Sequence, residues 1–152
     1  PDGRQETYLN GENVEREIRT LEVANGASRV STIGFVRREL VRQQQRMGLE
    51  KGIVMDGRDI GTVVFPEAEL KVFVTASADV RAQRRYDELV TKGQAEDFEA
   101  VLANVKERDE RDTNRVESPL KQAHDALLID NSLLTKTEQR DLLRKWFDEK
   151  TR

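Results

Sequence analysis

Several kinds of residue and segment are missing from this chain. It contains no cysteine, which excludes disulfides, a thiolate metal site and a thiol nucleophile. It also has no apolar run of about 18 residues, the length that a membrane-spanning helix needs. Its first residues lack the basic and then apolar order of a secretory signal. We therefore expect a cytoplasmic protein without a membrane span.

An excess of basic charge is missing as well. The 26 Lys and Arg residues are outnumbered by 29 Asp and Glu residues, and the formal net charge is −3. General nucleic-acid binders and membrane-surface proteins usually carry net basic charge. We therefore expect no nucleic-acid or membrane partner, and any bound anion should be small and held locally. The single histidine, His124, lies in a polar stretch before a predicted strand, so we interpret it as a surface imidazole rather than a ligand or base.

The hydrophobic residues that are present suffice for one core and follow a repeating order. The chain has 152 residues, of which 36% are hydrophobic, as in one ordinary domain. Three short apolar runs, at 52–56, 70–75 and 126–130, are separated by segments with helical spacing. Such an order is typical of a parallel sheet covered by helices on both faces. The predicted fold class is therefore α/β.

The N-terminal third of the chain predicts a turn and several short helices. Residues 7–9 resemble a strand that ends at Asn10-Gly11, a pair that tolerates positive φ in a tight turn. Apolar residues at helical spacing follow over 14–47, and Gly26 and Gly34 interrupt them. We expect two or three short helices in this segment.

The remaining helices carry clear start and stop signals. Ser77 can cap a helix over about 77–91, with Gly93 beyond its end. A longer helix is predicted from about 96 to 114, because apolar residues recur at i, i+3, i+4 and i+7 in its first half. The pair Ser118-Pro119 ends this region, and an amphipathic helix around 142–147 closes the chain.

The helix predicted at 96–114 changes character in its second half. At about 100° per residue, four charged residues there share one stripe: Arg108, Arg111, Asp112 and Arg115. Like charges at this spacing repel, so the cluster predicts a bound anion, and phosphate suits the planar guanidinium fork. Asp112 could orient one fork or accept a hydrogen bond from a sugar hydroxyl. The alternative is a solvated helix with ion pairs, such as Arg108 with Asp112.

A glycine-flanked turn and a second arginine-bearing helix follow the first two predicted core strands. Arg58 and Asp59 come directly after the run at 52–56, where ligands of a parallel sheet bind. The alternative is a plain turn with a surface ion pair. The helix after the next strand has three arginines at helical spacing, Arg81, Arg84 and Arg85. Both arginine-bearing helices and the turn could face one crevice.

These segments together resemble bacterial cytidylate kinases. The resemblance lies in 57–66, 71–77 and 106–115, and in 9–12 and 17–24, which are similar to the nucleotide-binding insert of that family. It implies a P-loop nucleoside-monophosphate-kinase-like fold, with a parallel sheet flanked by helices. The implied division is 1–48 as the remainder of the monophosphate-binding region and 49–152 as the core, with an arginine-rich lid at about 81–115.

The resemblance implies transfer of the ATP γ-phosphoryl group to CMP or dCMP, with Mg²⁺ bridging the phosphates and no covalent enzyme intermediate. The implied substrate-binding residues are Ser28, Arg37, Arg58, Asp59, Arg108, Asp112 and Arg115. Of these, Ser28 and Arg37 would lie near the base, and they rest on the resemblance alone, since their spacing also suits an exposed serine and a helix-surface arginine. Arg84 and Arg111 are expected at the donor phosphates or the transferring group.

The sequence departs from the family pattern in one respect. Members begin with a strand and a phosphate-binding loop of the form G-x-x-x-x-G-K-[ST], and no such segment occurs in these 152 residues. The chain opens at Pro1 and not at Met. We therefore expect a C-terminal portion whose sheet is incomplete because the first strand and P-loop are absent. Its expected partner is the missing N-terminal segment, and alone it should be catalytically silent.

Two other functions stay open at this point. The chain could be a CMP-binding fragment or relic without transfer activity. It could also belong to a kinase for another small phosphate acceptor. A purely structural helical protein fits least, because it gives no reason for the arginine stripe and the glycine-flanked turn.

Overall fold

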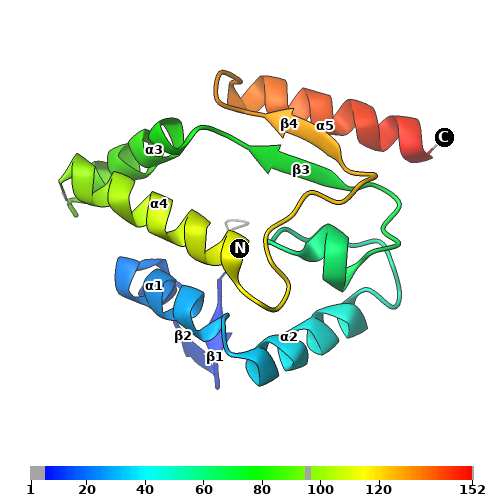
Figure 1. Cartoon of the computed structure of the whole chain (residues 1–152), viewed down its shortest axis with the longest axis horizontal. Coiled ribbons are helices and arrows are strands. Elements are labelled where there is room, and N and C mark those ends of the chain that lie inside the picture. Colours follow the sequence, from blue (N-terminus) through cyan, green and yellow to red (C-terminus); the bar gives the residue numbers. More distant parts are fainter. Residues whose placement is uncertain (1–5, 95–96, 152) are drawn as a thin grey trace.

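The described part of the chain is an α/β structure with a small parallel sheet. The computed structural model describes residues 6–94 and 97–151. Strands β3 (Val72–Thr75) and β4 (Leu127–Asp130) pair in parallel, with Val72 opposite Leu127. Helix α5 (Lys136–Thr151) lies alongside β4 (Figure 1). Two of the three predicted strands, those at 70–75 and 126–130, thus form a parallel sheet, as expected.

The strand predicted at 52–56 is wrong. No residue of this run belongs to a strand in the described chain, and Val54 is 99% exposed. A β-strand needs a hydrogen-bonded neighbour, and the described residues supply none for this run, so its apolar character alone does not make it a strand. The expected cover on both sheet faces is also not met, because Val74 and Leu128 are about half exposed.

Helices α3 (Ala78–Thr91) and α4 (Phe98–Asn114) form the main hydrophobic core, as their sequences predict. The Ser77 hydroxyl caps α3 by accepting a hydrogen bond from the Val80 N–H. The buried core residues of the two helices are Ala82, Leu89, Val101 and Leu102. Residue 96, where the second helix was expected to begin, lies outside the described residues.

The N-terminal third contains the expected turn and helices. Strands β1 (Tyr8–Leu9) and β2 (Glu12–Asn13) form an antiparallel hairpin, and the positive φ of Asn10 (52°) and Gly11 (87°) makes its tight turn. A 3₁₀ turn, η1 (Glu17–Arg19), leads into α1 (Leu21–Val30).

Helix α2 (Gly34–Met47) follows directly. Gly34 therefore begins a helix, whereas Gly26 lies inside α1 and does not interrupt it. Figure 1 shows α1, in blue, beside α4, and α2 runs below the turn that follows residue 56.

That turn becomes η2 (Ile60–Val64), a π-helical turn whose last residue is buried. Lys71, directly before β3, fixes it to the sheet: its Nζ donates to the Pro66 carbonyl and to Asp125 (2.8 Å), and its side chain packs against Gly61. The other end of the turn meets α2, because the Phe65 ring fills the space beside Gly48. The turn is therefore held between α2 and the sheet.

No helix among the described residues combines the length and the apolar character that a membrane crossing would require.

Candidate active site

A cavity of about 180 Å³ lies where α1, α2, the turn after residue 56 and the end of α4 meet. We call it the cationic cavity. Its lining comprises Ala27, Ser28, Ser31, Arg37, Gln44, Gly57, Arg58, Asp59, Ile60, Arg108, Asp112 and Arg115. All seven residues expected to bind the substrate are in this lining. Segments up to 88 positions apart in the sequence, from Ala27 to Arg115, therefore meet around one space.

The charges of the lining are unbalanced. Four of its residues are arginines and two are aspartates, which leaves a positive excess. The carboxylates are among the most deeply buried groups of the described chain, with Asp59 2% and Asp112 6% exposed. Buried charge is stable only when it is paired. A phosphate monoester, which carries up to two negative charges near neutral pH, would balance this lining.

The two aspartates hold the arginines in place. Asp59 forms an ion pair with Arg37 and lies 4.0 Å from Arg115 Nη2. Asp112 accepts a hydrogen bond from Arg58 Nε (3.0 Å) and lies 3.9 Å from Arg115 Nη1. Each carboxylate therefore joins arginines from two different elements. Asp112 orients one guanidinium fork, one of the two roles that the sequence allowed.

The turn after α4 places the Arg115 side chain, which is 4% exposed. Its Nε donates to the Ser118 carbonyl (2.6 Å), and Ser118 adopts a positive φ of 52°. The Leu120 N–H donates back to the Asp112 carbonyl (2.8 Å). The chain thus reverses directly after Asn114 and keeps the guanidinium inside the cavity.

Several arginine N–H groups in the lining are left without partners. Arg37 Nε, Arg108 Nε and Arg115 Nη2 are buried and have no hydrogen-bond partner among the described residues. A buried donor without an acceptor costs about 1–3 kcal/mol, and more when it is charged. Such groups in a native structure call for an acceptor, and an anion, another oxygen-rich ligand or ordered water can supply it.

The pKa values of two of these arginines reflect the same imbalance. Burial lowers the pKa of Arg108 from its usual value, and the nearby charge of Arg58 lowers it further. The pKa of Arg115 is lowered by burial and then by Arg37. Arginine remains charged in proteins regardless, so these shifts reflect the cost of burying the two guanidinium charges and, second, repulsion between guanidiniums in the cavity. A bound anion would relieve it.

The geometry decides against the solvated-helix alternative for the second half of α4. Arg108 and Asp112 form no ion pair with each other among the described residues, since Asp112 instead binds Arg58 on another element. Other α4 charges do pair at the surface, as Glu107 does with Arg111. The plain-turn alternative for residues 57–61 is wrong too, because Asp59 is buried among arginines of other elements.

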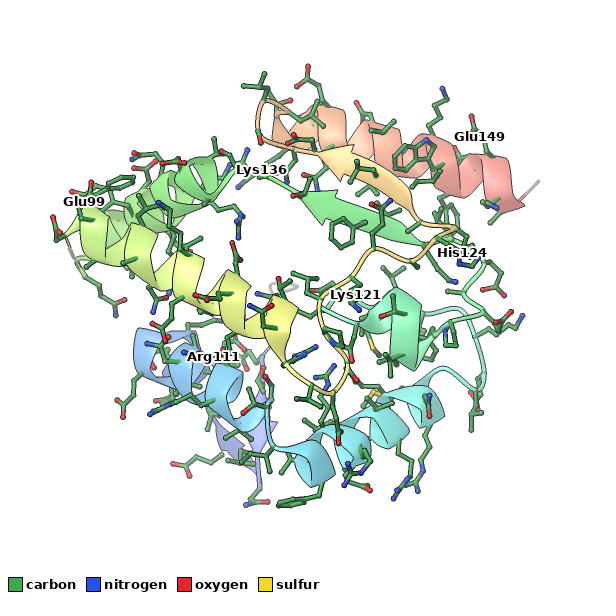
Figure 2. All side chains as sticks on the ribbon, in the orientation of Figure 1. Glu99, Arg111, Lys121, His124, Lys136 and Glu149 are labelled. Atoms are coloured by element: carbon green, nitrogen blue, oxygen red, sulfur yellow. The ribbon has the colours of Figure 1, made fainter. Side chains whose placement is uncertain are left out.

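Arg111 lies outside the lining of the cationic cavity. It donates from Nη1 to the Ser28 hydroxyl (2.9 Å) and also pairs with Glu107. Figure 2 shows its label on the side of α4 that faces α1. The single stripe expected from the sequence is therefore divided: Arg108, Asp112 and Arg115 reach the cavity, and Arg111 joins α4 to α1.

The arginines of α3 also lie outside the lining. Arg84 donates to the Asn131 side chain (3.0 Å) and main-chain carbonyl (2.7 Å), directly after β4. Arg81 forms a two-bond pair with Asp109 of α4, and Arg85 pairs with Glu88. The expectation that both arginine-bearing helices face one crevice is met for α4 and the turn, and not for α3.

Burial distinguishes two residues that the sequence could not separate from the surface. Ser28 is 7% exposed, and the Arg37 side chain is 11% exposed. The default of an exposed serine and a surface arginine is therefore wrong. His124, by contrast, has a side chain that is 97% exposed, beside Asp125 at 3.8 Å, so its interpretation as a surface imidazole is confirmed.

Sequence reasoning missed part of the lining. Ala27, Ser31, Ile60 and Gln44 line the cavity without having been singled out. A signal existed for Gln44: it lies seven residues after Arg37 on α2, a separation that returns almost to the same helix face. Once Arg37 faces a ligand, Gln44 should face it too.

The comparisons with known proteins agree with this geometry. The family model for cytidylate kinase matches residues 2–146. The cytidylate kinase of Bacteroides fragilis is 64% identical over 141 residues, which cover 93% of this chain and 62% of that protein. The cytidylate kinase of Parabacteroides distasonis is 65% identical over 138 residues, 91% of this chain and 60% of that protein.

A third relative extends the similarity beyond these genera. The cytidylate kinase of Flavobacterium johnsoniae is 63% identical over 137 residues, covering 90% of this chain and 60% of that protein. The chain thus spans about six tenths of the length of the curated relatives that it matches. Matched along nearly all of its length by the family model and by these relatives, the chain belongs to the cytidylate kinase family.

Proposed function

We propose that the cationic cavity binds CMP or dCMP, and that it serves as the acceptor site of a cytoplasmic kinase that transfers the γ-phosphoryl group of ATP to that nucleotide. The observation that carries this proposal is the pair of buried donors, Arg108 Nε and Arg115 Nη2, which lack hydrogen-bond partners among the described residues. Both line a cavity with a positive excess. The similarity to proteins named cytidylate kinases supplies the nucleotide.

In this proposal each part of the lining has a role. Arg58, Arg108 and Arg115 hold the α-phosphate, because guanidinium forks pair with phosphate oxygens. Asp112 keeps the Arg58 fork in place, and as a member of the same lining it is assigned to the ribose. Ser28 and Arg37 lie near the base, and Asp59 sets the angle between Arg37 and Arg115.

Phosphoryl transfer needs little from the protein beyond positioning and electrostatic stabilisation. The buried ion pairs of Asp59 and Asp112 provide the positioning, since they fix the arginines before the ligand binds. The positive excess of the lining provides the electrostatic stabilisation, because it keeps the acceptor phosphate ionised and close to the γ-phosphoryl group. No side chain is asked to form a covalent intermediate.

We place Arg84 and Arg111 at the donor side. Arg84 lies at the carboxyl end of β4, where parallel sheets bind ligands, and Arg111 is one turn from Arg108. We also propose that the chain divides into a monophosphate-binding part, 1–48, and a core, 49–152. The arginine-rich lid of the core covers about 81–115.

The donor and its metal have less support in these residues. The sequence holds no G-x-x-x-x-G-K-[ST] segment, and the described residues contain no cluster of three or more His, Cys, Asp or Glu side chains that could hold a metal ion. We propose instead that these 152 residues bind the acceptor, and that transfer requires a P-loop segment supplied by the intact protein.

Calorimetric titration of the chain with CMP tests the acceptor site. CMP should bind, and Arg108→Met should weaken binding by about 10-fold to 100-fold, the range expected for losing a charge-assisted hydrogen bond. Arg42→Met is the matched control, since Arg42 lies on exposed α2 surface paired with Glu39. Absence of CMP binding, or equal affinity of all three proteins, would overturn the proposal.

A transfer assay separates the remaining alternatives. With ATP and Mg²⁺, the chain should bind CMP without producing CDP at a normal rate, as a binding module would. Comparing CMP, dCMP, UMP and AMP as ligands tests whether the acceptor is a cytosine nucleotide. Tighter binding of AMP or UMP would favour a kinase for another small phosphate acceptor.

A further inference from the structure

We propose that Gln44 reads the base of the bound nucleotide and favours cytosine over uracil, by accepting a hydrogen bond from the exocyclic amine of cytosine. This inference rests on the proposed function, because it assumes that a pyrimidine monophosphate occupies the cationic cavity. It assigns a specificity role to a side chain that the phosphate argument leaves unused.

The first observation is an unpartnered buried oxygen. Gln44 lines the cavity, and its Oε1 is buried with no hydrogen-bond partner among the described residues. The Asp59 carboxylate nearby is different, because it has ion pairs with Arg37 and Arg115. Gln44 Oε1 has no comparable contact. A buried amide oxygen without a donor is unfavourable, so a ligand that brings an N–H group to it gains affinity.

The second observation is the position of Gln44 on α2. Gln44 and Arg37 are seven residues apart on α2 and share one face of that helix. Both line the same cavity. The arginines of α4 and of the turn stand on other elements. With the phosphate held by those arginines, the α2 face is where the rest of the nucleotide extends.

The chemistry of the two bases then determines the preference. Cytosine carries an amino group at C4, which donates, whereas uracil carries a carbonyl there, which only accepts. An acceptor on the protein pairs with the first and opposes the second. The positive lining also favours the oxygen of the Gln44 amide, rather than its NH₂ group, on the cavity side. A site built to hydrogen-bond a ligand group discriminates against an analogue that lacks it.

The test is the ratio of the UMP and CMP dissociation constants, measured by calorimetry on the full chain. Gln44→Met removes the acceptor with little change in shape or helix propensity, and it should lower this ratio by about 3-fold to 10-fold, the effect of one neutral hydrogen bond. The control Gln43→Met, at an exposed position hydrogen-bonded to Glu39, should leave the ratio unchanged. Gln44→Glu keeps an acceptor and should keep the preference for CMP.

Ribose 5-phosphate separates this inference from the proposed function. It carries the sugar and phosphate without a base, so its affinity should be the same in the native chain and in Gln44→Met. If the native chain fails to bind CMP, the proposed function is wrong. If it binds CMP but Gln44→Met leaves the ratio unchanged, raises it, or weakens all three ligands equally, base reading by Gln44 is wrong. Circular dichroism on each variant identifies one that has not folded; should Gln44→Met not fold, Gln44→Ala, which also removes the acceptor, carries the test with the same expected drop in the ratio.

Discussion

Asp59→Asn is the substitution that probes the cationic cavity most directly. Asp59 is 2% exposed and joins Arg37 of α2 to Arg115, beyond the end of α4. Asparagine keeps the size of the side chain and removes its charge. Two buried guanidiniums would then lose their shared counter-charge, and breaking a buried ion pair in this way costs about 3–5 kcal/mol.

The effect is large enough to measure by urea denaturation. For a slope of about 2 kcal/mol per M, a loss of this size lowers the unfolding midpoint by about 2 M. Phosphate should recover part of the lost stability, because an anion in the cavity supplies negative charge beside the same arginines. The midpoint of Asp59→Asn should therefore rise more steeply with phosphate concentration than that of the native chain, at constant ionic strength.

The matched control is Glu69→Gln, which removes a carboxylate from an exposed pair with Lys51. Surface pairs of this kind contribute little, so its midpoint should stay close to that of the native chain and respond to phosphate as the native chain does. A shift for Asp59→Asn no larger than that of this control would refute the argument that Asp59 balances the buried arginines. So would a shift that phosphate leaves unchanged.

Two further predictions concern the contacts that hold the turn after residue 56. Gly48→Ala should destabilise the chain by about 1–3 kcal/mol, because a Cβ there overlaps the Phe65 ring. Its control, Gly26→Ala, lies in open space inside α1 and should stabilise the chain by about 0.5–1 kcal/mol. Equal effects of the two substitutions in urea denaturation would contradict the contact between Gly48 and Phe65. The hydrogen bond from Lys71 holds the pKa of Asp125 below its usual value, so its contribution is complete above about pH 4 and is lost as the pH falls through the lowered pKa. The midpoint difference between the native chain and Lys71→Met should accordingly shrink below pH 4, and a difference that does not change with pH would argue against this pair.

Local signals in the sequence were enough for the hairpin and for most helices. Asn10-Gly11 determines a tight turn because both residues adopt positive φ at low cost. Ser77 caps α3, and the apolar spacing of α4 gives it one buried face. These features depend on residues within a few positions of one another, which is why they could be predicted.

The strand expected at 52–56 is an element that local sequence signals could not predict correctly. An apolar run of this length suits a strand, but pairing is decided by a neighbour that is distant in sequence. In the described chain the strands at 72–75 and 127–130 pair with each other, whereas the run at 52–56 pairs with no strand. Gly26 shows that local propensity does not decide a helix either, since the residues around it maintain α1 despite its low helix propensity.

The sequence by itself determined that arginines gather on the second half of α4 and on a glycine-flanked turn, because helical periodicity and turn chemistry are short-range. Only the tertiary structure decided which of them share a space. It buried Ser28 and Arg37, brought Asp59 between arginines of two elements, turned Arg111 toward α1, and added Gln44 to the lining. The physical reason is that charge balance in a buried cavity depends on contacts between residues far apart in the chain, and periodicity carries no information about them.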